Sequence, residues 1–188
     1  MSEPEGIVLA ACPADIIELV AFSGRAADLA TLAGGRGLTL PGSGGIVARA
    51  GRCALQVRPE RWLVLSPRAA PGESAAQWLK VGDGCAAIVD LSSALAGFLL
   101  KGPLVGEMLA RACRLDLAAG AFPAGTAAAT IMVQVPAILA RLTPGMLLLT
   151  PATTARHLRE WLVASSRPFG LELGPDTTVS ELCGDGAT

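Results

Sequence analysis

Residues 54–67, ALQVRPERWLVLSP, and residues 139–151, LARLTPGMLLLTP, follow the same pattern and decide the fold. With one gap at Glu60, each reads as a strand, a turn that contains proline, an apolar strand, and then Ser-Pro or Thr-Pro. A serine or threonine suits the residue that caps a helix, and proline suits the first turn of the helix. The two stretches therefore predict a hairpin that leads into a helix, repeated once along the chain.

A helix with one apolar stripe is predicted after each stretch. Each helix carries a small or apolar residue, a tryptophan and a leucine at positions i, i+3 and i+4: Ala75, Trp78 and Leu79 in the first, and Leu158, Trp161 and Leu162 in the second. This spacing places the three residues on one face of a helix. We therefore expect Trp78 and Trp161 to be equivalent core residues of two repeated units.

The repeat extends upstream and downstream of these stretches. Upstream, each unit shows a strand and then a helix with one apolar face, made by Ala26, Leu29, Ala30 and Ala33 in the first unit and by Val105, Met108, Leu109 and Ala112 in the second. Residues 86–91 and 169–173 are candidate strands that close the two units. Each half thus reads strand, helix, strand, strand, helix, strand, which is the ferredoxin-like order βαββαβ.

This order predicts an α+β fold of two tandem ferredoxin-like halves related by internal duplication, at residues 10–92 and 93–173. A unit of about 75 residues has a thin core by itself, so the two halves are expected to pack together. After Gly174 the chain becomes polar and short of large apolar residues. We therefore expect a mobile tail at residues 174–188.

The composition excludes several classes of protein. Of 188 residues, 52% are hydrophobic and only 16% are charged, which is incompatible with an intrinsically disordered chain. The 15 basic and 16 acidic residues give a net charge of −1, and no basic cluster marks a nucleic-acid-binding surface. Few charges and a net charge near zero promote association. The surface either reflects a compositional preference for Ala, Gly and Arg or is partly built to contact another protein.

Neither a membrane span nor a secretory signal is expected. The longest apolar stretch, residues 127–149, is interrupted by Gln134, Pro136 and Arg141, so we interpret it as two or three strands. The chain starts with an acidic segment where a signal peptide would be basic. The five cysteines are widely spaced and form no Cys-x-x-Cys pair, which favours reduced thiols in the cytoplasm over disulfides or a zinc site.

Few side chains could carry chemistry, and each has a plain structural alternative. The one histidine, His157, could act as a general base, but it lies on the flank of a predicted helix and is interpreted as solvent-exposed. Glycine clusters at residues 34–37 and 42–45 match no dinucleotide-binding or phosphate-binding motif and are interpreted as loops that need positive φ. No catalytic, cofactor-binding or metal-binding residue is therefore assigned.

Three charged residues beside apolar positions have two interpretations each. Asp90 follows an apolar run, and an Asp-turn at the end of a strand is favoured over catalysis. Asp116, between two leucines, is interpreted as the outward residue of a short strand. Arg61 could pair across an interface beside Trp62, or it could be the solvent-facing residue of an alternating strand, which we favour.

Several short motifs follow one another along the chain: the turn at residues 58–63 (RPERWL), Asp90-Leu91-Ser92, Lys101-Gly102-Pro103, residues 113–117 (CRLDL), residues 122–126 (FPAGT) and the closing helix at residues 155–162. In their order and spacing they resemble the gamma subunit of heterotetrameric sarcosine oxidase. They lie within residues 10–165, so the resemblance covers most of the chain. That family is itself similar to the folate-binding aminomethyltransferases of the glycine-cleavage T-protein superfamily, and the resemblance implies the same fold.

The resemblance implies a subunit of an oxidising complex with alpha, beta, gamma and delta chains. Such a complex oxidises the N-methyl group of sarcosine and passes one carbon to tetrahydrofolate. Flavin, NAD, zinc and folate would then belong to the partner subunits, and this chain would hold no cofactor. Related complexes that oxidise other N-methyl amino acids use similar gamma chains, and the sequence does not separate them. Candidates for the surface that meets the alpha or beta chain are Trp62, Arg61 and the strand at residues 95–100.

The chain departs from the catalytic aminomethyltransferases at one place. Those enzymes carry a pair of aspartates just before the strand that matches residues 138–142, and one of the pair contacts the pterin. Here the two positions are Val135 and Pro136, whose side chains neither accept a hydrogen bond nor carry a proton. We therefore expect a non-catalytic structural subunit. The alternatives are a stand-alone folate-binding protein and a regulatory or assembly module of another complex.

Overall fold

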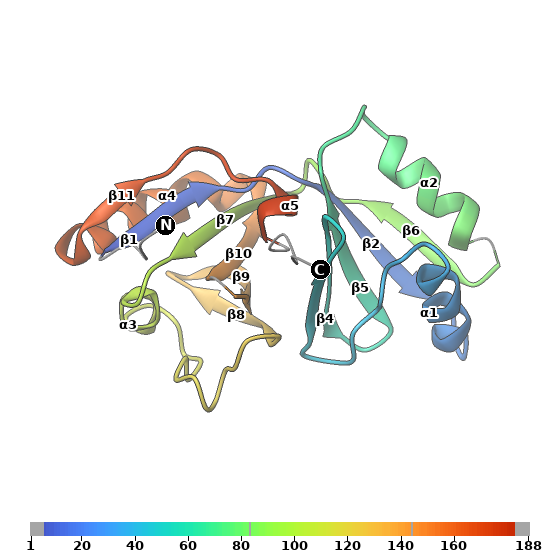
Figure 1. Cartoon of the computed structure of the whole chain (residues 1–188), viewed down its shortest axis with the longest axis horizontal. Helices are drawn as coiled ribbons and strands as arrows, with labels where there is room; N and C mark the ends of the chain where they lie inside the picture. The colour runs from blue at the N-terminus through green and yellow to red at the C-terminus, as the bar shows by residue number, and fades with distance from the viewer. Residues whose placement is uncertain (1–5, 83, 144, 183–188) are drawn as a thin grey trace. The chain divides into compact units, whose positions relative to one another are not determined.

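The computed structural model describes residues 6–82, 84–143 and 145–182. Its elements form two compact units, each with its own sheet and helices (Figure 1). The first-half unit contains residues 13–93 and 178–182, and the second-half unit contains residues 6–12 and 94–177. The predicted α+β fold of two ferredoxin-like halves is confirmed.

A five-stranded sheet forms the first-half unit, and every neighbouring pair of strands in it is antiparallel. Its spatial order is β3 (Ile46–Arg49), β4 (Arg52–Arg58), β5 (Arg61–Ser66), β2 (Asp15–Ala21) and β6 (Ala86–Asp90). Helix α1 (Ala26–Gly34) connects β2 to β3, and helix α2 (Glu73–Gly82) connects β5 to β6. Without β3, the order β4-β5-β2-β6 is that of a ferredoxin-like βαββαβ unit.

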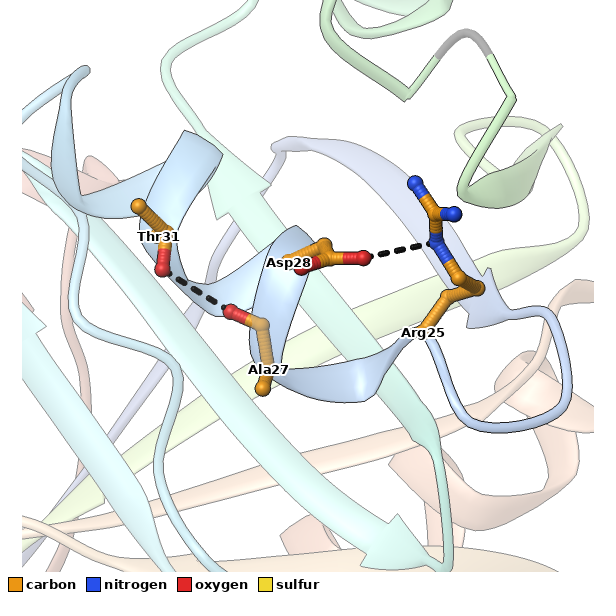
Figure 2. A network of polar contacts seen from close by, with 4 residues as sticks. All are labelled: Arg25, Ala27, Asp28 and Thr31. Carbon is orange, nitrogen blue, oxygen red and sulfur yellow. Dashed lines mark hydrogen bonds and ion pairs between the residues drawn. The ribbon is translucent and has the colours of Figure 1, made fainter.

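Helix α1 begins with local polar contacts and is held by its apolar face. Arg25 pairs through Nε with Oδ2 of Asp28 at 2.7 Å, and Thr31 Oγ1 donates to the carbonyl of Ala27 at 3.0 Å (Figure 2). The Arg25 and Asp28 side chains are half exposed, so their pair contributes at most about 1 kcal/mol. Leu29, which is completely buried in the core, holds the helix in place.

A six-stranded sheet forms the second-half unit. Its spatial order is β11 (Leu171–Leu173), β1 (Ile7–Ala11), β7 (Leu95–Lys101), β10 (Met146–Pro151), β9 (Val135–Arg141) and β8 (Ala127–Met132). Its helices are α3 (Val105–Ala110), α4 (Ala152–Ser166) and the short 3-10 helix η1 (Arg167–Phe169). Strands β7, β9, β10 and β11 correspond to β2, β4, β5 and β6, and β8 corresponds to β3.

Strand β1 distinguishes the two sheets, because it lies between β7 and β11 while their counterparts β2 and β6 pair directly. It runs antiparallel to β7 and parallel to β11. Ile7 and Leu9 of β1 are 0% and 3% exposed. A strand from the start of the chain therefore completes the sheet that the later half builds.

Two glycines, Gly6 and Gly102, let the backbones around β1, β7 and β11 approach closely. A Cβ atom at Gly102 would collide with the carbonyl oxygen of Gly6, and one at Gly6 would collide with that of Gly170. Gly102 also has a φ of 124°, which side chains rarely tolerate. The strand insertion thus depends on glycine at positions far apart in the sequence.

The duplication extends to two-residue hairpin turns. Ala50 and Gly51 join β3 to β4, Val133 and Gln134 join β8 to β9, and all four residues have φ between 49° and 73°. Two consecutive positive φ values suit the right-handed twist of a hairpin. Val133 is β-branched, so this conformation costs roughly 1–3 kcal/mol there. The sequence analysis did not predict β3, whereas β8 lies in the stretch interpreted as two or three strands.

Each unit has its own hydrophobic core. Trp78 is 6% exposed and belongs to the first-half core, whereas Trp161 is only partly buried against the second-half core. Leu79 is 57% exposed, so its predicted place in the apolar stripe of α2 is wrong. The buried stripe of α2 instead passes through Ala75, Trp78 and Gly82, which turns Leu79 to the surface. Trp78 and Trp161 correspond in sequence but differ in burial.

The unit boundary between Ser93 and Ala94 lies next to the predicted one, but residues 10–12 belong to the second-half unit. Part of the predicted tail is packed. Helix α5 (Val179–Leu182) lies against β4 and β5, and its two terminal side chains are at most 2% exposed. The apolar residues at 179 and 182 explain this packing. Residues 183–188 of the predicted mobile tail lie outside the described residues.

Replacing Trp78 by alanine should destabilise the chain by roughly 3–5 kcal/mol, because the change opens a cavity in the first-half core. Trp161→Ala should cost less than about 2 kcal/mol, since less apolar surface is removed from the core. Denaturant melts of both variants measure the change in the free energy of unfolding. Equal losses in the two variants would contradict the packing described above.

Candidate functional site

The charged and polar residues singled out from the sequence lie on the surface and are not brought together. His157 is exposed on α4, as expected. Arg61 is exposed at the start of β5, and its Nη1 lies 3.6 Å from Oε1 of Glu18 on the neighbouring strand β2. Arg61 is therefore the solvent-facing strand residue that the sequence favoured.

Two of the three candidates for a partner-facing surface are wrong, because the fold buries them. Trp62 is 6% exposed, and its Nε1 donates to the carbonyl of Pro41 at 2.8 Å. Phe98, Leu99 and Leu100 of β7 are at most 5% exposed, and β7 has strands on both sides. Of the three, Arg61 alone remains accessible.

Asp90 stabilises a turn. Its Oδ1 accepts the backbone N–H of Ser92 at 2.9 Å, and Ser92 Oγ accepts the backbone N–H of Ile16 at 3.0 Å. The end of β6 is thereby tied to the start of β2. Hydrogen bonding from the side chain and then the backbone of Ser92 lowers the pKa of Asp90 below its ordinary value. The predicted Asp-turn is confirmed.

Asp116 also stabilises a turn, and its predicted place in a short strand is wrong. Its Oδ1 accepts the backbone N–H of Ala118 at 2.9 Å. Around it, the strand pairing consists of one isolated bridge between Cys113 and Met132. The side-chain bond to the backbone two residues on competes with strand pairing, which explains the loop.

Val135 and Pro136 open strand β9. Val135 is 9% exposed and belongs to the second-half core, and the carbonyl of Pro136 accepts Thr150 Oγ1 at 3.0 Å. Neither side chain can bind a pterin or handle a proton. The sequence between Asp116 and Glu160 holds no Asp or Glu that could replace the missing carboxylates. The start of β9 therefore offers no side-chain carboxylate for acid–base chemistry.

The glycine clusters are loops of the predicted kind. Gly37 and Gly44 have φ values of 73° and 74°. Gly37 follows α1, and Gly44 precedes β3. Their positive φ values explain why glycine stands at both positions.

Asp15 is a buried carboxylate that the sequence analysis missed. It is 9% exposed, and its Oδ2 accepts the backbone N–H of Ala69 at 3.1 Å and Ser74 Oγ at 2.7 Å. These bonds tie β2 to the start of α2. Its position inside the apolar run from Ala14 to Val20 is the signal that could have marked it.

An open cavity of about 710 Å³ lies in the second-half unit, beside α3 and the ends of β7 and β9. Lys101 and Arg141 line it together with Val105, Leu117, Leu142 and Met146. Arg141 Nη2 donates to the carbonyl of Leu117 at 2.6 Å, which fixes the guanidinium at the wall. No lining residue that the structure describes is acidic. This cavity is the candidate binding site, and no sequence motif marks it.

Metal ligands do not cluster within residues 6–82, 84–143 and 145–182, where no group of three His, Cys, Asp or Glu side chains could hold an ion. The described cysteines, Cys12, Cys53, Cys85 and Cys113, are all buried. None of the helices in the described part of the chain is long and apolar enough to cross a membrane.

The sequence is similar to one curated protein in particular. The protein named sarcosine oxidase subunit gamma from Corynebacterium sp. (strain P-1) is 30% identical over 147 residues, which cover 76% of this chain and 71% of that protein. No protein-family model matches the chain. The similarity therefore rests on about three quarters of this chain.

Two solved structures share the fold. A chain of heterotetrameric sarcosine oxidase from Corynebacterium sp. U-96, in complex with pyrrole 2-carboxylate, has a TM-score of 0.77 and 22% identity, with coverage of 93% of this chain and 90% of that one. The glycine cleavage system aminomethyltransferase T from Bartonella henselae has a TM-score of 0.64 and 15% identity over 91% of this chain. The match covers 48% of the aminomethyltransferase, so this chain corresponds to about half of it.

Replacing Asp90 by alanine should destabilise the chain at neutral pH by at most about 1 kcal/mol, because an exposed hydrogen-bonded turn is lost. The pKa of Asp90 is lowered by folding, so its charge stabilises the fold above the unfolded-state pKa of 3.8. That contribution disappears as the pH falls through the folded-state pKa. Denaturant melts at a series of pH values should show that Asp90→Ala lowers the free energy of unfolding at pH 7. The difference from the unchanged chain should be smaller in acid.

The matched control is Asp176→Ala, which removes an exposed aspartate elsewhere in the chain. If the loss in free energy of unfolding caused by Asp90→Ala stays constant as the pH is lowered below 3.8, the ionised Asp90 carboxylate is not what stabilises the end of β6.

Proposed function

The chain belongs to the family of sarcosine oxidase gamma subunits, and we propose that it is a non-catalytic structural subunit of a complex of that type. The complex would oxidise the N-methyl group of sarcosine or of a related N-methyl amino acid. In this proposal the chain supplies a folded support for its partner subunits and no reacting group.

One observation carries the non-catalytic assignment. Val135 and Pro136 stand where the folate-dependent aminomethyltransferases have aspartates, and Val135 is packed into the second-half core. An aspartate introduced at position 135 would bury a charge beside apolar side chains, at a cost of several kcal/mol, whereas Pro136 is exposed. The position is therefore used for packing, and this supports a role in assembly over one in folate chemistry.

The proposed partners are the alpha, beta and delta subunits of such a complex. Flavin, NAD, zinc and folate would be held by those subunits, and the complex would be cytoplasmic. The buried cysteines support a reducing compartment, because thiols that pack as small apolar groups do not need oxidation for stability.

Two edge strands are the proposed partner-facing surfaces. β6 and β8 each end a sheet, and their exposed residues Val89 and Ile131 are 41% and 63% accessible. Strand β8 carries no charged residue and no proline, either of which would hinder pairing with another strand. The nearby Pro136 lies on β9. An apolar edge strand without such protection is suited to pairing with another chain. We therefore place part of the contact surface at these edges.

Co-expression with the alpha, beta and delta subunits of a sarcosine oxidase tests the proposal. The full chain should co-elute with them in one peak on size-exclusion chromatography, in equimolar amount by quantitative mass spectrometry. Ile131→Lys should lower the amount of chain in that peak, because it places a charge on the β8 edge. His157→Lys, which adds a charge at an exposed helical site, should co-elute like the unchanged chain.

Elution of the unchanged chain apart from all three partners would refute the subunit assignment. If that free chain also bound a reduced folate stoichiometrically, the stand-alone folate-binding alternative would replace it. Equal co-elution of Ile131→Lys and His157→Lys would leave the subunit assignment intact and remove β8 from the contact surface.

A further inference from the structure

The cavity of the second-half unit combines an apolar floor with a basic wall. Val105, Leu117, Leu142 and Met146 line it, and each of these residues is at most 9% exposed. Its volume of about 710 Å³ lies within the range of pockets that hold small organic ligands. The floor can therefore bury an apolar group of ligand size.

Two cations contribute to the same cavity. Lys101 ends β7 and Arg141 ends β9, so elements far apart in the sequence bring both residues to the same cavity. No described residue that lines the cavity is acidic. Two cations beside an apolar floor raise the local positive potential, and this potential favours an anion.

The acidic residues nearest to this wall in sequence are engaged elsewhere. Asp116 Oδ1 accepts the backbone N–H of Ala118. Glu107 Oε1 on α3 lies 3.9 Å from Arg111 Nη2, with both side chains more than half exposed. Neither carboxylate bonds to Lys101 or Arg141, so these two acids do not offset the positive charge in the cavity.

Arg141 is held in place and has an unused donor. Its Nη2 donates to the carbonyl of Leu117 at 2.6 Å, while its buried Nε has no hydrogen-bond partner. An unsatisfied buried donor costs roughly 1–3 kcal/mol. A small shift of the side chain toward an anion in the cavity would give this edge of the guanidinium an acceptor, and the planar guanidinium suits a carboxylate.

We propose that this cavity binds an organic carboxylate with an apolar body, with Lys101 and Arg141 on the carboxylate and the floor residues on the apolar part. The inference does not depend on the proposed function, because it concerns a site within one unit of this chain. The carboxylate could belong to a free metabolite or to another protein, because both share this chemistry. Binding of a free small molecule by the full chain, with no partner present, distinguishes the first source from the second.

Isothermal titration of the full chain with three probes tests the proposal. Hexanoate should bind saturably at one site, and its neutral analogue hexanamide should bind at least about tenfold more weakly, since it lacks the charge. Inorganic phosphate should also bind about tenfold more weakly than hexanoate, because it has no apolar part. Lys101→Gln should weaken hexanoate binding roughly tenfold.

Two further variants locate the site. Arg141→Gln should weaken hexanoate binding at least as much as Lys101→Gln, provided that its circular dichroism and melting temperature show a folded chain. The Lys101 side chain forms no hydrogen bond or ion pair with another described residue, so Lys101→Gln is expected to fold and its result stands even if Arg141→Gln fails to fold. The control Arg159→Gln, at an exposed position on α4, should bind hexanoate within about twofold of the unchanged chain.

Three results would overturn the proposal. They are the absence of saturable hexanoate binding, equal affinity for hexanoate and either other probe, and an equal loss of affinity in Lys101→Gln and Arg159→Gln. Loss of hexanoate binding in the assembled complex alone, with binding in the free chain, would show that a partner occupies the same carboxylate site and would support the assigned chemistry.

Discussion

The pairing of β1 with β7 and β11 is the contact on which the second-half unit depends. The counterparts of β7 and β11 in the first-half unit, β2 and β6, pair directly with each other. In the second-half unit, β1 supplies hydrogen bonds to both neighbours and buries Ile7 and Leu9. The duplicated halves are thus similar in sequence pattern and different in how their sheets close. Glycines at positions 6 and 102 make the closer approach of the backbones possible.

The start of β9 has no side chain suited to acid–base chemistry. The chain shares its fold with an aminomethyltransferase of the glycine cleavage system, and the side chains of Val135 and Pro136 neither accept a hydrogen bond nor carry a proton. A shared fold does not carry an activity with it, because activity resides in particular side chains. The basic cavity beside α3 and the ends of β7 and β9 is where we propose that this scaffold holds a ligand.

The sequence predicted what depends on local pattern and missed what depends on long-range pairing. The repeated hairpin and helix pattern gave the duplication, and the Asp-Leu-Ser turn at Asp90 formed as expected. The insertion of β1 could not be predicted, since nothing in residues 7–11 distinguishes a partner in the second half from one in the first. The prediction for Leu79 was wrong because helical spacing shows which residues share a face of the helix. It does not show which residues of that face point toward the sheet. The cavity was missed because Lys101 and Arg141 meet only through the sheet order.

Amide hydrogen exchange tests the role of β1 most directly, by comparison of the full chain with a chain that lacks residues 1–12. Local stability is read from exchange element by element, so each unit reports separately. We expect the amides of β7, β10 and β11 to lose protection in the shortened chain, while those of β2 and β5 exchange as they do in the full chain. Unchanged protection of β7 and β11 without residues 1–12 would contradict the claim that β1 completes the second sheet.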